Sequence, residues 1–315
     1  MSETAQLSGS NKIIKSPVLI FHSAAALIKC PMSYSPKSYD DLSEIADTIR
    51  KQVQLKEIPK IGIICGSGLG TIADCIEQAE ILSYTKIPGF PTAHVIGHKG
   101  NLVFGYMNGK YVVCVQGRFH PYEHGMNLAL CAMPVRIMHL LGVETLIVSN
   151  AAGGINSNFK VGDLMIIKDH IFLPGLAGFS PFVGPHDQRF GERFISLHEA
   201  YDQKLRKLAM EVAKQQKIRI HEGVYAMNGG PQYESPAEIR MLKLIGTDAI
   251  GMSTCHEVAV ACQMGMRVFG CSLITNAANV DADKTVAVTH EEVLKAGEEA
   301  QKRTCSFICE IIKNL

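Results

Sequence analysis

The 315-residue sequence has no excess of charge of either sign and no hydrophobic run long enough to cross a bilayer. Its formal net charge is +1, so the composition does not favour nucleic acid or a membrane surface as a partner. Near-neutrality does not argue against a small anionic ligand, because such a ligand needs only a few well-placed donors. With 47% hydrophobic residues, the chain can bury a substantial core.

The ten cysteines form no Cys-x-x-Cys pair. Their spacing matches neither a structural zinc site nor a disulfide framework, and several lie inside apolar runs. We therefore expect free thiols and a cytoplasmic location, where thiols stay reduced.

The beginning of the chain is the part that the sequence explains least. Two lysines precede the apolar run PVLIFHSAAALI (17–28), which loosely imitates a signal peptide, but His22 interrupts the run and no clean cleavage site follows. We expect residues 1–36 to be a poorly ordered N-terminal extension and residues 37–315 to form one domain.

After residue 36, short apolar segments alternate with longer amphipathic ones. The short segments are typical of strands buried on both faces and comprise residues 61–65, 111–116, 144–150, 163–169, 223–228, 248–252 and 267–275. Helices are predicted at 41–52, 127–142, 198–216 and 291–315, with Pro134 kinking the second or marking a late start. The alternation, without repeats or Gly/Ser linkers, predicts a single-domain α/β fold with a mixed sheet and helices on both faces.

Polar residues follow these strands, and ligands of α/β sheets bind at the carboxyl ends of strands. In GSGLG (66–70), glycines let the backbone approach an anion and Ser67 adds a hydroxyl. The motif lacks the spacing of a dinucleotide fingerprint, which argues against a nicotinamide-dependent enzyme, and it lacks the ending of a P-loop. An equal alternative to anion binding is that GSGLG forms only a tight turn between a strand and a helix.

The segment GRFHPYE (117–123) follows the second strand. Arg118, His120 and Tyr122 alternate, so their side chains point the same way in an extended chain. A guanidinium beside an imidazole suits an oxyanion.

Two further segments place small or polar residues at strand ends. NAAGG (150–154) leaves backbone N–H groups open to a ligand, although Asn150 could simply cap a turn. In STCHE (253–257), Thr254 and Glu257 predict a capping box, which places Ser253 beside a helix start, a natural anion site.

A carboxylate and an amide form a separate group. Ser235 and Glu238 predict a capping box with a helix beginning at Pro236, so Glu234 lies at a helix N-terminus, where it stays ionised as an acceptor, with the Tyr233 ring beside it. The alternative is that this segment only caps the helix.

Asn276 follows the last strand, and a third capping box of Thr289 and Glu292 places His290 in the first turn of the last helix. A histidine at such a position is usually only a surface residue. Taken together, anion donors and heterocycle partners indicate phosphate and a nucleoside.

In their order, these motifs resemble the trimeric purine nucleoside phosphorylases. The matching segments, which run from about residue 41 to the C-terminus, are GSGLG, VIGHKG (95–100), QGRFHPYE, SNAAGG, GPQYES, GMST, SLITN and THEEV. The resemblance implies a single-domain phosphorylase/hydrolase-like fold with a twisted mixed sheet. It also implies a homotrimer, and phosphorolysis of inosine, guanosine and their deoxy forms in purine salvage. Inorganic phosphate would be a co-substrate, with no cofactor, metal, nucleic acid or membrane partner.

The resemblance also implies a role for each site residue. Phosphate would be bound by Ser67, His98, Arg118, His120, Ala151 and Ser253. Ribose would be bound by Tyr122, Met252, His290 and, from a neighbouring subunit, Phe194. The base would be bound by Glu234, Asn276, Tyr233 and Thr275, and catalysis would depend on Asn276, Glu234 and His98.

Several positions depart from the pattern of the resembling enzymes, and they put the base preference in question more than the chemistry. They are Asn228, Tyr233, Cys255, His256, Ala277 and Ala278. A relative with altered or broadened base specificity is therefore an open alternative. A methylthioadenosine phosphorylase is another, against which Asn276 and His290 argue. A catalytically idle nucleoside-binding protein is a third.

Overall fold

The computed structural model describes residues 34–278 and 289–315. Our prediction for the N-terminal extension falls largely outside these ranges. Its last three residues, however, contact the domain: the Tyr34 hydroxyl donates to Glu44 at 2.8 Å, and Arg136 donates to the Pro36 carbonyl at 2.9 Å.

Nine strands of the described residues form one mixed sheet, in the order β2-β3-β4-β1-β5-β8-β7-β6-β9. Their bounds are β1 Ile61–Ile64, β2 Glu77–Ser83, β3 Asn101–Met107, β4 Lys110–Gln116, β5 Thr145–Gly154, β6 Leu164–Phe172, β7 Ile220–Met227, β8 Ala249–Gly251 and β9 Arg267–Ala277. Strand β5 pairs with β9 as well as with β1 and β8. The strands from β5 to β9 therefore close into a ring, while β1 to β4 extend from it as an open sheet.

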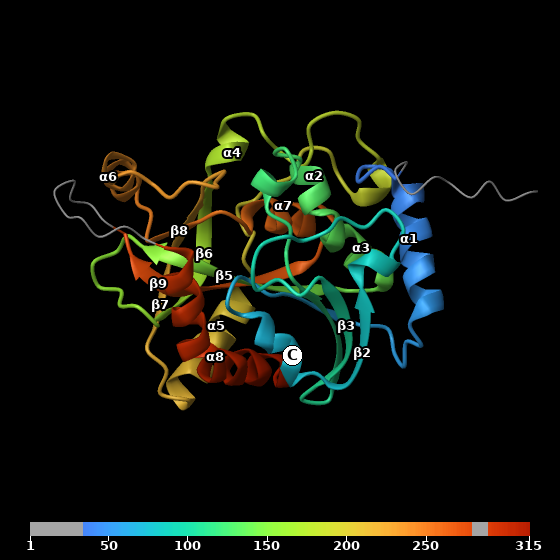
Figure 1. The fold of residues 1–315 in the computed structure, drawn as a ribbon, viewed down its shortest axis with the longest axis horizontal. Coiled ribbons are helices and arrows are strands. Elements are labelled where there is room, and N and C mark those ends of the chain that lie inside the picture. The colour runs from blue at the N-terminus through green and yellow to red at the C-terminus, as the bar shows by residue number, and fades with distance from the viewer. Residues whose placement is uncertain (1–33, 279–288) are drawn as a thin grey trace, which may run out of the picture. The chain divides into compact units, whose positions relative to one another are not determined.

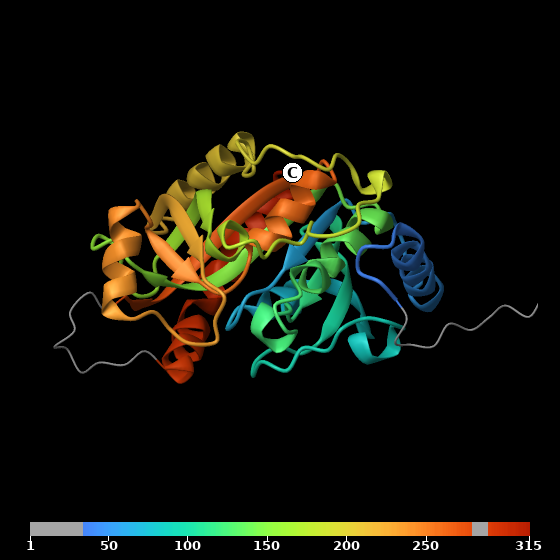
Figure 2. The ribbon, with the colours of Figure 1, turned by 90° about the horizontal axis from the view of Figure 1, so that it is seen from above.

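Helices cover both faces of the sheet, as the sequence predicted. Their bounds are α1 Tyr39–Gln52, α2 Leu128–Cys131, α3 Met133–Leu141, α4 Leu173–Leu176, α5 Gln203–Gln215, α6 Pro236–Leu244, α7 Cys255–Gln263 and α8 His290–Lys313. Buried side chains of α1, α3 and α7 form one core, and those of α5 and α8 form another. Figure 1 shows α1 beside α3 and α5 beside α8, and Figure 2 shows α6 at the opposite end of the domain from α1.

All seven predicted strands are present, and two more were missed. Strand β2 (EQAEILS) is an edge strand with mostly exposed residues, so it lacks the continuous apolar run that identified the others. Strand β3 is mostly buried and pairs with β2 and β4 in an antiparallel meander. The predicted helix 127–142 is two helices, and Pro134 lies in the first turn of the second.

Two of the three predicted capping boxes are confirmed, at Ser235 with Glu238 and at Thr289 with Glu292. The third is wrong. Thr254 precedes α7 with a φ of 81° and makes no side-chain capping bond; its hydroxyl instead accepts from the Asn150 amide at 2.9 Å. Asn150 also caps no turn, because β5 continues through it to Gly154.

Within the described ranges, no helix combines the length and apolarity that crossing a membrane would require.

Candidate active site

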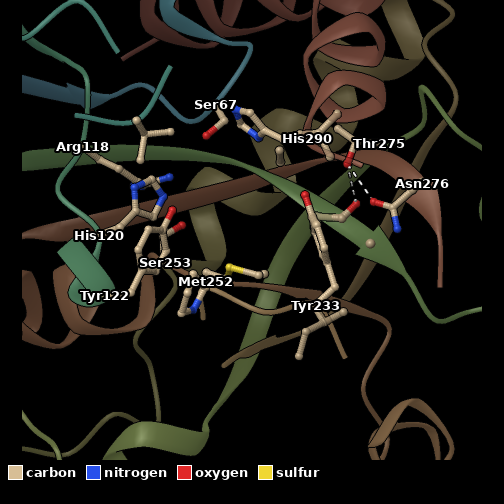
Figure 3. Close-up of a pocket in the computed structure, with 18 of the residues that line it drawn as sticks. Ser67, Arg118, His120, Tyr122, Tyr233, Met252, Ser253, Thr275, Asn276 and His290 are labelled. Atoms are coloured by element: carbon tan, nitrogen blue, oxygen red, sulfur yellow. Dashed lines mark hydrogen bonds between the residues drawn. The ribbon is translucent and has the colours of Figure 1, made fainter. Parts of the chain in front are cut away.

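A cavity of about 460 Å³ opens where the carboxyl ends of the strands meet. Every predicted site residue except His98 and Phe194 lines it: Ser67, Arg118, His120, Tyr122, Ala151, Tyr233, Glu234, Met252, Ser253, Thr275, Asn276 and His290. Figure 3 shows Arg118, His120 and Tyr122 on one side of the cavity and Thr275, Asn276 and His290 on the other. Residues at or after the ends of β1, β4, β5, β7, β8 and β9 therefore lie together around one cavity.

The loop after β1 approaches β5 closely. A Cβ atom on Gly66 would lie 2.6 Å from the Cα atom of Asn150, so only glycine fits there. The Gly66 N–H donates to the Ser149 hydroxyl at 3.3 Å. These contacts fix the position of Ser67 at the cavity wall.

Arg118 is held from behind by Glu257 of α7. Its Nε and Nη2 atoms donate to the two carboxylate oxygens at 3.1 and 2.6 Å, and Nη1 donates to the Ser149 carbonyl at 2.7 Å. Both side chains are almost fully buried, with 1% and 2% of their surface exposed. Burial alone would raise the pKa of Glu257, but the positive charge of Arg118 holds it below its usual value.

The sequence does not predict this role of Glu257, because its spacing from Thr254 is also that of a capping box. A signal was present: Glu257 lies in the apolar run of CHEVAVAC. A carboxylate in a buried helix requires a charged partner.

His98 lies behind Ser67 and does not line the cavity. Its Nδ1 lies 3.0 Å from the Arg118 carbonyl and therefore donates to it, which leaves Nε2, at 3.2 Å, as an acceptor for the Ser67 hydroxyl. Burial lowers the pKa of His98 to about 4, so the ring is neutral at pH 7. The hydroxyl proton of Ser67 thus points toward His98.

His120 lies between an aromatic ring and a carboxylate. Its ring stacks on Tyr122 with a centroid separation of 5.1 Å, and its Nδ1 is 3.7 Å from Glu123 Oε2, a separation longer than a hydrogen bond that becomes an ion pair only when the ring is protonated. Burial lowers the pKa of His120. Burial would raise the pKa of Glu123, but the neighbouring His120 and the His94 N–H, which donates to it at 3.0 Å, keep it lowered.

The opposite end of the cavity carries the carboxylate and the amide. Glu234 precedes α6, and burial raises its pKa. The single hydrogen of the Thr275 hydroxyl has two acceptors within reach, Asn276 Oδ1 at 3.1 Å and the Ala152 carbonyl at 3.4 Å (Figure 3). With Oδ1 next to Thr275, the amide nitrogen of Asn276 is the atom that can donate to a ligand.

Phe194 lies away from this cavity. It is 92% exposed and lines a second, apolar hollow of about 540 Å³. Its neighbours there are Phe172, Leu176, Phe182, Val183, Ile195 and Leu197.

The departures from the expected pattern lie mostly outside the cavity wall. Cys255 and His256 are fully buried in α7, and burial lowers the pKa of His256 to about 4. Ala277 and Ala278 follow Asn276 without lining the cavity. Tyr233 does line it. Among the described residues, no three His, Cys, Asp or Glu side chains are grouped so as to hold a metal ion.

The sequence matches the model of the phosphorylase superfamily over residues 60–313. The purine nucleoside phosphorylase of Anopheles gambiae is 47% identical over 280 residues, which cover 88% of this chain and 78% of that protein.

Two solved structures are also similar. The Schistosoma mansoni purine nucleoside phosphorylase in complex with adenosine has a TM-score of 0.85 at 47% identity, covering 89% of this chain and 98% of that chain. Isoform 2 from the same organism, in complex with cytosine and ribose-1-phosphate, has a TM-score of 0.84 at 44% identity, covering 89% and 99%. The superfamily match spans all the residues that line the cavity. The chain belongs to the phosphorylase superfamily and, within it, to the purine nucleoside phosphorylases.

Proposed function

We propose that this enzyme uses inorganic phosphate to cleave inosine, guanosine and their deoxy forms, releasing the base and (deoxy)ribose 1-phosphate. The observation that carries the proposal is the orientation of Asn276. Its amide nitrogen faces the same cavity as Arg118 and His120, which suit an anion. One cavity thus offers a donor for a base at one end and donors for an oxyanion at the other.

At the anion end, phosphate would be bound by Arg118, His120, Ser253, the Ser67 loop and the backbone at Ala151. Arg118 retains hydrogens on Nη1 and Nη2 beyond those it gives to Glu257 and Ser149. His98 would act through Ser67, with which it shares a hydrogen bond, rather than by contacting phosphate.

At the base end, Glu234 would accept the N1–H of a 6-oxopurine and Asn276 would donate to N7. Thr275 fixes the Asn276 amide, and the Tyr233 ring provides a face for the base. Tyr122, Met252 and His290 would contact the ribose between the two ends, since all three line the cavity.

The mechanism follows from where charge develops. As the glycosidic bond breaks, the purine gains negative charge and the ribose gains positive charge. The Asn276 donation to N7 strengthens as that charge grows, and this difference between ground and transition state is what accelerates a reaction. Phosphate held under the ribose is both the nucleophile and the counter-charge. This chemistry calls on no cofactor besides the co-substrate phosphate.

The identity of the sugar product tests the proposal. Incubation with inosine and phosphate should release hypoxanthine and ribose 1-phosphate in equal amounts, and omission of phosphate should stop the release. Free ribose as the product would indicate a hydrolase instead. Binding of inosine without any release would indicate the catalytically idle alternative.

We also propose a homotrimer in which Phe194 completes the ribose site of a neighbouring subunit. Its 92% exposure and its distance from the cavity of its own chain support this. Subunits carrying Phe194→Ala and subunits carrying Asn276→Asp should each be weakly active. Co-assembled trimers should regain activity, because some sites then combine an intact Phe194 with an intact Asn276. No gain on co-assembly would contradict the shared site.

A role in purine salvage in the cytoplasm is part of the same proposal. The nine described cysteines are all free, as expected in a reducing compartment.

A broadened base range is a second candidate. The similar isoform 2 structure from Schistosoma mansoni contains cytosine, a pyrimidine. Of the departures, Tyr233 lines the base end of the present cavity, and Asn228 donates to Glu234, which lines it. Cytidine therefore belongs in any substrate panel.

A further inference from the structure

Asn228 follows the last residue of β7 and joins two parts of the loop that leads to α6. Its side-chain Oδ1 accepts from the Gly230 N–H at 2.9 Å, and its Nδ2 donates to Glu234 Oε1. Its backbone N–H donates to the Gly251 carbonyl of β8 at 2.9 Å. The residue is therefore fixed to the sheet while its side chain reaches the carboxylate.

The orientation of the Asn228 amide is determined by these partners. Only an oxygen can accept from the Gly230 N–H, so Oδ1 must face Gly230 and Nδ2 must face Glu234. The bond to Gly230 closes a turn of the kind in which an asparagine side chain accepts from the backbone two residues onward. Each end of the amide thus has one protein partner, and the side chain does not line the cavity.

The bond to Glu234 has two consequences. It occupies Oε1, which leaves Oε2 as the oxygen available to a ligand in the cavity. It also stabilises the charged form of a carboxyl group that lies in a partly buried position. Asn228 itself does not line the cavity, so it acts on a ligand only through Glu234.

We propose that Asn228 is a positioning residue for base recognition, which holds Glu234 ionised and turned so that one carboxylate oxygen accepts the N1–H of a 6-oxopurine. This inference rests on the proposed function. It adds a determinant of specificity outside the cavity wall.

Asn228→Asp separates the two bonds of the side chain. The aspartate keeps an oxygen that accepts from Gly230, so the turn survives, but it cannot donate to Glu234 and adds a like charge beside it. Both effects raise the pKa at which the pair of carboxyl groups takes up a proton. Asn228→Val removes both bonds.

The measurement is the pH dependence of kcat/KM for inosine at saturating phosphate. A hydrogen bond to a charged group is worth about 1.5–3 kcal/mol, so its loss should move the acidic limb up by about one to two pH units in both variants. At a pH below both limbs, kcat/KM of Asn228→Asp should fall by roughly 10–100-fold, the fold-change that corresponds to this shift, and the two profiles should converge as the pH rises above the shifted limb.

Two controls make the result specific. The riboside of unsubstituted purine has no N1–H for Glu234 to accept. Its kcat/KM should therefore change by less than about threefold in Asn228→Asp, much less than the loss expected for inosine. Asn127→Asp, in which an oxygen still accepts from Leu130 at the start of α2, should leave the inosine profile unchanged.

An Asn228→Asp profile that superimposes on that of the unmodified enzyme would overturn the inference. It would be overturned equally if only Asn228→Val lost activity, because the turn alone would then matter. An unmodified protein that releases no hypoxanthine from inosine and phosphate would instead refute the proposed function, whatever the variants do.

Discussion

Arg118 and Glu257 form a buried, two-pronged ion pair behind the anion end of the cavity, with N–O distances of 3.1 and 2.6 Å. Arg118 nevertheless lines the cavity, on the same side as His120 (Figure 3). Glu257 therefore contributes to the site through Arg118, without lining the cavity itself.

Glu257→Gln should strongly destabilise the fold. It leaves the charge of Arg118 buried without a counter-charge, and breaking such a pair typically costs about 3–5 kcal/mol. The free energy of unfolding in urea measures the effect. Glu144→Gln is the matched control, because Glu144 pairs with Lys60 on the surface, where the loss should be at most about 1 kcal/mol. Equal losses in the two variants would contradict the role given to the buried pair.

Binding of a dianion should be coupled to protonation of His120. In the free protein, burial lowers the pKa of His120, so the ring is neutral at pH 7. A bound dianion beside it favours the imidazolium and raises this pKa. The affinity for the dianion should therefore increase as the pH falls from the His120 pKa of the complex toward the lower His120 pKa of the free protein. For a single proton, the increase is at most about tenfold per pH unit.

Sulfate is the appropriate probe for this coupling, because it stays a dianion over the whole range. Calorimetry at pH 8, 7 and 6 should show tightening in the unmodified enzyme and a flat response in His120→Asn. His221→Asn, at a histidine paired with Asp163 outside the cavity, should keep the slope. A pH-independent affinity in the unmodified enzyme would rule the coupling out.

Asn276→Asp should reverse the preference for 6-oxopurines. The aspartate cannot donate to N7, and loss of one transition-state donor typically lowers kcat about 10²–10³-fold. It can, however, accept from the 6-amino group of adenosine, which inosine lacks. We expect kcat/KM for inosine to fall by about 10²-fold and the ratio of inosine to adenosine turnover to fall with it. Unchanged discrimination between the two nucleosides would show that Asn276 does not read the base.

Gly230→Ala should impair nucleoside binding beyond its effect on stability. Gly230 has a φ of +61°, and a Cβ there would lie 2.7 Å from both Met252 Sδ and Tyr122 Cδ1. Gly246→Ala shares the positive φ, at +89°, but meets no atom within 4 Å. Both variants should lose about 1–2 kcal/mol of stability. Only Gly230→Ala should raise KM for inosine. A similar KM in Gly230→Ala and Gly246→Ala would exclude a contact between this turn and the ribose.

Strands buried on both faces were predictable because their apolar runs are continuous, and the motifs at their ends then followed from the rule that ligands bind at the carboxyl ends of strands. Strand β2 was missed because its residues are mostly exposed and do not form an apolar run. The closing of β5 onto β9 depends on pairing between residues more than a hundred positions apart, for which a local pattern carries no signal.

Residues that act through others were the hardest to predict. Glu257 follows Thr254 at the spacing of a capping box. In the structure, the positive φ of Thr254 prevents the capping bond, and this φ cannot be predicted from the spacing. Asn228 was recognised as a polar residue at an unusual place, but its two bonds depend on the path of the loop from Gly230 to Glu234. Positions at strand ends, together with the family resemblance, therefore predicted residues that face the cavity, but they did not predict how Glu257 and Asn228 support them.

The most direct test of the central claim is a nucleoside panel assayed with and without phosphate. Inosine, guanosine, adenosine and cytidine should be compared by kcat/KM, with the sugar product identified. We predict phosphate-dependent release of base and ribose 1-phosphate, fast for inosine and guanosine and slow for adenosine. Equal turnover of adenosine and inosine, or release of base without phosphate, would contradict the claim.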